Sequence, residues 1–366
     1  MILIETDRDA LLKPLSVVSG IVERRHTLPI LSNVLIERKG ERLRFATTDL
    51  EIQITTEAQS DGAGTDTAIT TSARKLQEIL RALPEKVKVQ LEQKDNRLLI
   101  KAGKSRFSLQ TLPAEDFPIQ TRGAVQYQEK MRQKDLKQLL CLVQYAMAQQ
   151  DIRYYLNGLL VVVEEEKLKV VATDGHRLGY ASLKQKQKTR LEVILPRKAV
   201  TEAGRLLADT EDEVSIELAP NQARISFSNI ELVTKVVDGK FPDYTRVIPT
   251  GNQKHFQIPR VVLQQALQRM AILANEKFRG VRWVLTDKSL RIICTNNEQE
   301  EAQEELEVNY KGDALDIGFN ISYLLDVLNN LDCEEISCSF GDANSSALIT
   351  IPGNEDFKYV VMPMRI

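Results

Sequence analysis

A unit the length of a whole domain is written three times into this chain of 366 residues. The tripeptides Thr48-Asp49-Leu50, Thr173-Asp174-Gly175 and Thr295-Asn296-Asn297 each end a strand-like apolar run. From Thr48 to Thr173 is 125 residues, and from Thr173 to Thr295 is 122. A period this long is typical of tandem domains rather than of a solenoid. We place the domains at residues 1–125, 126–250 and 251–366.

Within each repeat the pattern predicts two half-units, each an amphipathic helix with three or four strands. Leu76, Ile79, Leu80 and Leu83 are spaced i, i+3, i+4 and i+7, which is the helical period. The run 86–91 alternates polar and apolar residues, which is typical of an antiparallel strand with one wet face. The sequence therefore predicts an α+β fold with six helices packed on antiparallel sheets.

Charge alone does not mark this chain as a DNA-binding protein. The 49 basic and 51 acidic residues give a net charge of −2, whereas DNA-binding domains are usually basic. Basic residues do recur on the predicted helix faces, for example Arg74 and Lys134, but the last helix carries Asp326 and nothing basic. The basic helix faces therefore favour contact with phosphates, although the last helix departs from the pattern.

Several other classes are disfavoured. No stretch approaches the ~20 apolar residues of a membrane span, and the N-terminus lacks the features of a signal peptide. The four cysteines form no CxxC pair, so we expect buried free thiols in a reducing cytoplasm, with no metal or other cofactor. No GxxxxGK[ST] nucleotide-binding loop is present.

The sequence around Asp174 and His176 invites a catalytic interpretation, in which an aspartate orients a histidine base. No nucleophile or metal set accompanies this pair, and catalysis requires such a constellation. We expect instead that Asp174 accepts hydrogen bonds from backbone N–H groups in a tight turn at Gly175. A hydrolase thus remains a disfavoured alternative, and no catalytic residue is predicted.

Seven segments together resemble the bacterial sliding clamp family, the beta subunits of the replicative DNA polymerase III. The resemblance covers the whole chain, and it rests on residues 28–33, 105–109, 153–158, 172–178, 238–244, 275–282 and 359–366. It implies a processivity factor that is not an enzyme: a ring of two chains, head to tail, with helices lining the hole. An ATP-driven clamp loader would open the ring.

A size estimate agrees with two chains. Helices are ~10 Å across, so six side by side close a circle with a hole of ~9 Å, and twelve leave ~28 Å. Only the larger hole admits a duplex, whose major groove alone is ~12 Å wide. The implied DNA contacts are independent of base sequence, and the residues that the resemblance places near the double-stranded DNA are Arg24, Arg74, Gln150, Tyr154, Tyr155, Arg197 and Lys198.

The resemblance also implies an interface between the first domain of one chain and the third domain of the other. A basic edge and an acidic edge would steer this homodimer while apolar residues hold it. The residues assigned to the interface are Lys104, Arg106, Phe107, Leu109, Ile272, Leu273, Glu300 and Glu304.

Finally, the resemblance implies an apolar pocket between the second and third domains. The replicative polymerase and other partners would insert a short peptide there, typically a glutamine followed by leucine and phenylalanine. Asn344 is a polar residue where the family is expected to have a small apolar one. The alternative is a protein scaffold that never encircles DNA. The assigned pocket residues are Leu156, Thr173, Gly175, His176, Arg177, Leu178, Pro242, Arg246, Val247, Phe278, Asn320, Tyr323, Ser346, Val360, Val361, Met362, Pro363, Met364 and Arg365.

Overall fold

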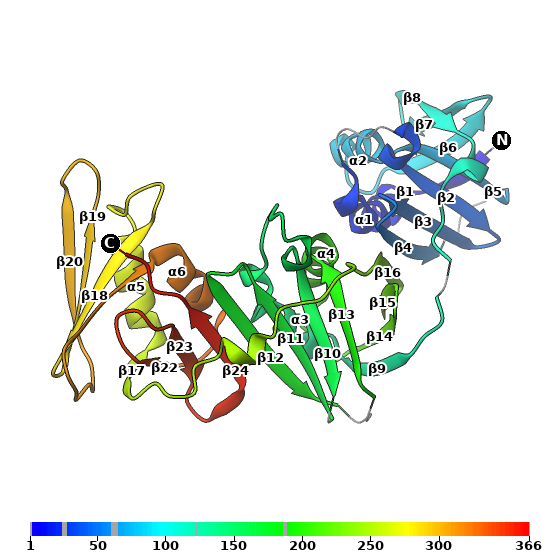
Figure 1. Cartoon of the computed structure of the whole chain (residues 1–366). Helices are drawn as coiled ribbons and strands as arrows, with labels where there is room; N and C mark the ends of the chain where they lie inside the picture. Colours follow the sequence, from blue (N-terminus) through cyan, green and yellow to red (C-terminus); the bar gives the residue numbers. More distant parts are fainter. Residues whose placement is uncertain are drawn as a thin grey trace. The chain divides into compact units, whose positions relative to one another are not determined.

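The computed structural model describes residues 2–23, 28–59, 65–121, 123–164, 166–185 and 189–365 (Figure 1). Contacts divide the chain into two compact units, Met1–Lys137 with Lys198–Val236, and Gln138–Arg197 with Val237–Ile366. Each unit thus contains one terminal repeat and part of the central repeat. In the described ranges no helix is long and apolar enough to cross a membrane.

The predicted helices are present at their expected places. Ser72 caps the second, where its Oγ accepts a hydrogen bond from Lys75 N at 3.4 Å. A proline inside a helix removes a backbone hydrogen bond and commonly kinks or breaks the helix, but the first helix begins at Arg8 and continues through Pro14, which is buried. The bounds are α1 Arg8–Val18, α2 Ala73–Ala82, α3 Gln133–Cys141, α4 Arg197–Leu206, α5 Arg260–Met270 and α6 Ile321–Asn330.

The strands form three sheets in which every pair is antiparallel. The first has the order β1 (Ile2–Asp7), β6 (Lys88–Lys94), β7 (Arg97–Ala102), β8 (Ser105–Leu112), β5 (Thr67–Ser72), β2 (Asn33–Lys39), β3 (Arg42–Thr48), β4 (Ile52–Gln59), β16 (Ile230–Lys235), β15 (Gln222–Phe227), β14 (Glu213–Ala219) and β9 (Tyr127–Arg132). The second has the order β13 (Leu191–Pro196), β10 (Gly158–Glu164), β11 (Lys167–Thr173), β12 (Arg177–Lys184), β24 (Asn354–Val361), β23 (Ala347–Ile351), β22 (Glu335–Phe340) and β17 (Lys254–Pro259). The third has the order β20 (Glu301–Glu307), β19 (Ser289–Thr295), β18 (Gly280–Thr286) and β21 (Leu315–Asn320).

Each repeat builds a first and a second half-sheet. The first half-sheets are β2–β5, β10–β13 and β18–β21. The second half-sheets are β1 with β6–β8, β9 with β14–β16, and β17 with β22–β24. In the first repeat, α1 and α2 pack against each other, and α1 also packs on β3 and β4 (Figure 1); α5 and α6 make the matching pair in the third repeat.

Neighbouring repeats are joined by sheet pairing. An edge strand of the first half-sheet in one repeat pairs with an edge strand of the second half-sheet in the next repeat. β4 pairs with β16, with Leu232 opposite Ile54, and β12 pairs with β24, with Arg177 opposite Val361. Each of these joints contains five antiparallel residue pairs. Backbone donors and acceptors of both strands are thereby satisfied across the repeat boundary.

The first two of the tripeptides that revealed the repeat form the same turn, and the third forms a related turn that is one residue longer. Asp49 Oδ1 accepts from the N–H groups of Glu51 and Ile52, and Asp174 Oδ1 accepts from those of His176 and Arg177. Asn296 Oδ1 accepts from Glu298 and Glu300. The expected role of Asp174 as an acceptor for turn donors is thus confirmed. These side chains close the hairpin-like link after β3, β11 and β19.

An aromatic cluster fills the core of the third repeat. Trp283 contacts Phe319 at 5.4 Å between ring centroids and Phe340 at 6.3 Å. Cys294 and Cys338 lie buried in the same cluster, whereas Cys333 is half-buried. Burial raises the pKa of the Cys338 thiol to about 12. The nucleophilic thiolate is therefore almost absent at neutral pH.

We expect Cys338 to resist a thiol reagent in the native protein. At pH 8, iodoacetamide followed by peptide mass spectrometry is expected to label Cys333 faster, because its side chain is partly accessible. Cys338 is expected to react fully only after denaturation in guanidinium. Labelling of native Cys338 as fast as Cys333 would contradict the buried position.

Candidate functional site

A cavity of about 210 Å³ lies in the unit that holds the second sheet. Its walls come from the loop around η5 (Tyr154–Leu156), the β11–β12 turn, the segment after β16, and β24 with the residue that follows it. Apolar surface predominates, with a few polar groups at the rim, as in small-ligand and peptide sites. The lining residues are Arg153, Leu156, Thr173, Gly175, His176, Arg177, Leu178, Phe241, Pro242, Tyr244, Val247, Val360 and Met362.

The β11–β12 turn forms one rigid wall of the cavity. Thr173 Oγ1 donates to Arg177 O at 2.6 Å and accepts from Gly175 N at 3.1 Å. The other wall is tied to the turn, because Met362 N donates to His176 O at 2.8 Å. The β12–β24 joint therefore fixes the distance between the two walls.

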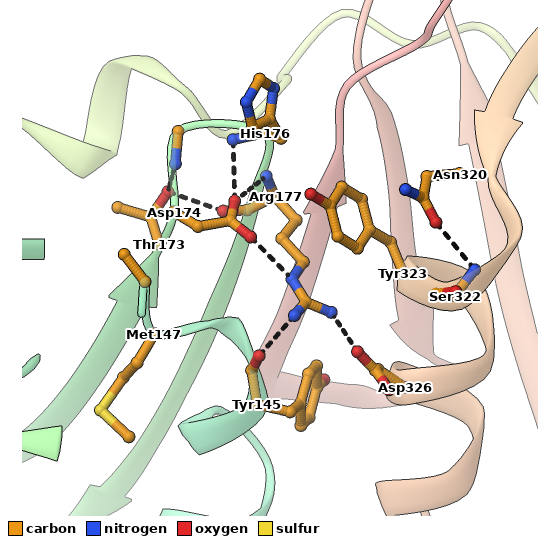
Figure 2. A network of polar contacts seen from close by, with 12 residues as sticks. Tyr145, Met147, Thr173, Asp174, His176, Arg177, Asn320, Ser322, Tyr323 and Asp326 are labelled. Atoms are coloured by element: carbon orange, nitrogen blue, oxygen red, sulfur yellow. Dashed lines mark hydrogen bonds and ion pairs between the residues drawn. The ribbon is translucent and has the colours of Figure 1, made fainter. Parts of the chain in front are cut away.

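Arg177 lies behind this turn, and its guanidinium is surrounded by acceptors (Figure 2). Nε donates to Asp174 Oδ2 at 3.1 Å, Nη1 to Asp326 Oδ2 at 2.5 Å, and Nη2 to Tyr145 O at 2.6 Å. Only 9% of the side chain is exposed. Although burial opposes the charged form, the nearby phenol of Tyr359 and the two carboxylates raise the pKa of Arg177 above its ordinary value. The cation is permanent.

At the rim, Arg153 packs over Gly175. Its guanidinium is paired with Asp151, with Nη2 to Oδ2 at 2.8 Å, and Nη2 also donates to Asp174 O at 3.3 Å. Hydrogen bonds from Arg153 lower the pKa of Asp151 to about 2, so this carboxylate stays ionised at physiological pH. Gly175 has φ +90°, and a Cβ there would approach Nη1 of Arg153 to 3.1 Å.

Ten of the nineteen residues assigned to the pocket line this cavity. Val361 is buried in β24, Tyr323 lies with its ring 4.3 Å from the Arg177 guanidinium, and Met364 N donates to Gly318 O at 2.9 Å. Asn320 caps α6 by accepting from Ser322 N at 2.9 Å. Asn344 is exposed. The other assigned residues that do not line the cavity are Arg246, Phe278, Ser346, Pro363 and Arg365.

Three lining residues were not assigned from the sequence: Arg153, Phe241 and Tyr244. Signals for them existed. Phe241 repeats Phe117 after 124 residues, and both are buried. Tyr244 belongs to the same segment, and burial raises the pKa of its phenol to about 12, so it remains a neutral donor.

The residues assigned to DNA contact differ in their exposure to solvent and in whether they already form ion pairs. Tyr154 is 57% exposed, and Gln150 is exposed with φ +56°. Arg74 is paired with Glu78 at 2.7 Å on the surface of α2. Arg24 lies outside the described residues, and Tyr155 packs partly buried beside the cavity cluster.

Two assigned cations on α4 already have partners. Arg197 Nη1 donates to Met147 O at 2.8 Å. Lys198 Nζ binds Glu23 Oε1 at 3.0 Å and Asp49 Oδ2 at 2.5 Å. Although burial opposes its charge, the hydrogen bonds to Asp49 and Glu23 raise the pKa of Lys198. The ion pairs hold Lys198 against the first-repeat turn and reduce its free positive charge.

The residues assigned to the interface lie on or near two strand edges. In β8, residues 105–109 pair only with β7, and Phe107 is 36% exposed. β20, the outer strand of the third sheet, carries Glu301, Glu304, Glu305 and Glu307, and β19 is its only partner among the described strands. Just after α5, Ile272 is 79% exposed, and Arg269 at the end of that helix pairs with Glu304. Lys104 and Arg106 are exposed, and Leu109 and Leu273 are half-buried.

The pair Asp174 and His176 shows no catalytic geometry. Both carboxylate oxygens of Asp174 accept from the turn and from Arg177, and not from the His176 ring. The first repeat forms the same turn without a histidine. Across the described ranges no group of three His, Cys, Asp or Glu residues is arranged to hold a metal ion.

Comparison with known proteins gives a consistent result over the full length. Family models of the DNA polymerase III beta subunit match in three parts: the N-terminal domain at residues 2–121, the central domain at 130–243 and the C-terminal domain at 245–365. The beta sliding clamp of Pseudomonas putida is 46% identical over 361 residues, and that of Escherichia coli is 42% identical over 361 residues. The alignment covers 98% of this chain in both cases, with 98% and 99% of the relatives.

Solved structures agree. A crystal structure of the sliding clamp of Pseudomonas aeruginosa bound to griselimycin superposes with a TM-score of 0.95 at 46% identity, covering 100% of both chains. The sliding clamp of Caulobacter crescentus superposes with a TM-score of 0.91 at 38% identity, covering 99% of each chain.

We expect Gly175→Ala to disturb the cavity in a way that a matched glycine substitution does not. Both Gly175 and Gly353 have positive φ, but a Cβ at Gly353 would meet nothing within 4 Å. Each alanine is expected to lower the free energy of unfolding by about 1 to 2 kcal/mol, measured in urea. Only Gly175→Ala would also displace Arg153, so it alone is expected to weaken binding of a fluorescent peptide with glutamine, leucine and phenylalanine. Equal peptide affinity of both variants would contradict the contact.

Proposed function

This chain belongs to the DNA polymerase III beta subunit family, the beta sliding clamps, and we propose that two copies close head to tail around duplex DNA. The closed ring then tethers the replicative polymerase and other replication and repair proteins in the bacterial cytoplasm. As a member of the family the chain is a DNA sliding clamp that acts as a processivity factor and not as an enzyme. An ATP-dependent loader supplies the opening step.

The observation that carries this proposal is a strand pairing that occurs twice within the chain but has no third counterpart among the described strands. Two first half-sheets end in β4 and β12, which pair with β16 and β24 of the next repeat. The matching strand of the third repeat is β20, whose outer edge has no partner among the described strands. The matching second half-sheet of the first repeat ends in β8, whose residues 105–109 pair with no described strand other than β7. An open strand edge is a template for pairing with another chain.

Pairing β20 of one chain with β8 of another would repeat the joint that already occurs twice within the chain. Such a contact is heterologous, so two of them close a two-chain ring. The charges are complementary, since β8 is flanked by Lys104 and carries Arg106, while β20 carries glutamates. Phe107 and Ile272 would supply buried apolar area.

The cavity between β12, β24 and the segment after β16 is the proposed site for partner peptides. Its apolar lining suits leucine and phenylalanine side chains, and Met362 gives a flexible wall that accepts several sequences. Arg153 at the rim is 45% exposed, so it can meet a polar or acidic group of the peptide.

The proposed ring needs only weak contacts with DNA. A closed ring holds DNA by topology, so a few phosphate contacts suffice and no base is read. A net charge of −2 suits a ring that slides. Pairing of Arg74 and Lys198 with carboxylates favours the alternative, a protein scaffold that does not encircle DNA.

Loading onto circular DNA distinguishes the two. The protein is incubated with a nicked plasmid, a bacterial clamp loader and ATP, and half of the sample is then linearised with a restriction enzyme. We expect co-elution with the circle in gel filtration and loss from the linear form, because only topology holds the ring. Equal retention on both forms, or none with a loader that is active on its own clamp, would refute encirclement.

The interface has a separate test. We expect the double variant Ile272→Ala with Leu273→Ala to sediment as a monomer at micromolar concentration, since it removes apolar area beside the β20 edge. The control is Val261→Ala with Val262→Ala, which shortens two apolar side chains of α5 that are 43% and 44% exposed. The control is expected to remain dimeric. A dimer of unchanged stability in the first variant would place the interface elsewhere.

A further inference from the structure

Asp326 is the acidic residue that the charge pattern of the helices left unexplained. It lies on α6, where the sequence shows no basic residue. In the structure its Oδ2 accepts from Arg177 Nη1 at 2.5 Å (Figure 2). Asp326 belongs to the third repeat and Arg177 to the second, so the pair connects α6 to the cavity wall.

Arg177 is held from three directions. Asp174 belongs to its own turn, Tyr145 contributes a carbonyl that follows α3, and Asp326 approaches from α6. The ring of Tyr323, also on α6, lies 4.3 Å from the guanidinium carbon. Planar guanidinium groups bind well only when each N–H edge meets a fixed acceptor.

Asp174 meets a different nitrogen of the guanidinium than Asp326 does. Its Oδ1 already accepts from two backbone N–H groups, and its Oδ2 already accepts from Nε. Without Asp326, the Nη1 group of a nearly buried cation would lose its acceptor, which is strongly unfavourable. The guanidinium would have to turn toward water, and its movement would strain the turn that carries Thr173 and Gly175.

We propose that Asp326 is a positioning residue of the partner-peptide site, which acts through Arg177 to hold the β11–β12 turn against Met362 and Val360. This inference rests on the proposed peptide function of the cavity. Asp326 itself does not line the cavity. The side chain of Asp326 is 41% exposed, so solvent screens the charge attraction of the pair. What Asp326 mainly contributes is the acceptor for Nη1 of the buried guanidinium. Its effect is on the shape of the cavity.

The test compares two neutralised acids on the same part of the fold. Asp326→Asn keeps the shape of the side chain but removes its charge, and Asp332→Asn removes an equal charge just after α6, where the described residues show no contact with Arg177. A fluorescein-labelled peptide with glutamine followed by leucine and phenylalanine is titrated by anisotropy. We expect Asp326→Asn to weaken binding about tenfold, the scale of coupling between contacting residues, and Asp332→Asn to leave it unchanged.

A double-variant cycle separates positioning from general destabilisation. Arg177→Gln is itself expected to weaken binding, and in its background Asp326→Asn is expected to cause no further loss. Loss of equal size in both backgrounds, with a matching fall in Tm, would mean that Asp326 only stabilises the fold and would overturn the inference.

Peptide binding by the wild-type protein distinguishes a failure of the positioning role of Asp326 from a failure of the proposed peptide site. If it binds the peptide and Asp326→Asn binds equally well, the positioning role is wrong and the peptide site stands. If the wild-type protein does not bind the peptide at all, the proposed function of the cavity fails and the inference falls with it.

Discussion

Backbone pairing across the repeat boundaries is the constraint from which the rest of this structure follows. A half-sheet of four strands has two edges, and each edge leaves unpaired N–H and C=O groups. β4 with β16 and β12 with β24 satisfy these groups inside the chain. The second joint also brings residues of two repeats together, so the cavity between Leu178 and Val360 is a direct product of how the sheets are closed.

One local turn serves two different purposes in the first and second repeats. Asp49 and Asp174 use one oxygen to close the turn, which leaves the other oxygen free to hold a cation. In the first repeat that cation is Lys198, and in the second it is Arg177. In the third repeat the uncharged Asn296 closes a related turn that is one residue longer. Small changes in side chain thus gave one inherited turn distinct tertiary roles.

Periodicity was a sufficient guide to the elements, because the helical stripes and alternating strands depend on neighbours close in sequence. Leu76 and Leu80 lie buried on α2 as their spacing predicts. The cavity was less predictable. Phe278 and Ser346 were assigned to it by resemblance but do not line it, and Arg153 lines it without having been assigned. The partner of Asp326 was also out of reach, since Arg177 is 149 residues away in sequence and no pattern in either segment specifies the pairing.

The cavity is lined mainly by the central repeat, but Val360 and Met362 come from the far end of the chain. No single domain of this protein therefore contains the whole site, because the cavity needs residues of both the second and the third repeat. If the central repeat alone were exchanged with that of a relative, three walls of the cavity would come from the relative and the wall with Val360 and Met362 from this chain. The peptide specificity of such a chimera would then match neither parent. Substitutions at the site are accordingly expected to be correlated between the second and third repeats. Residues on the two sides of the β12–β24 pairing would then change together during evolution.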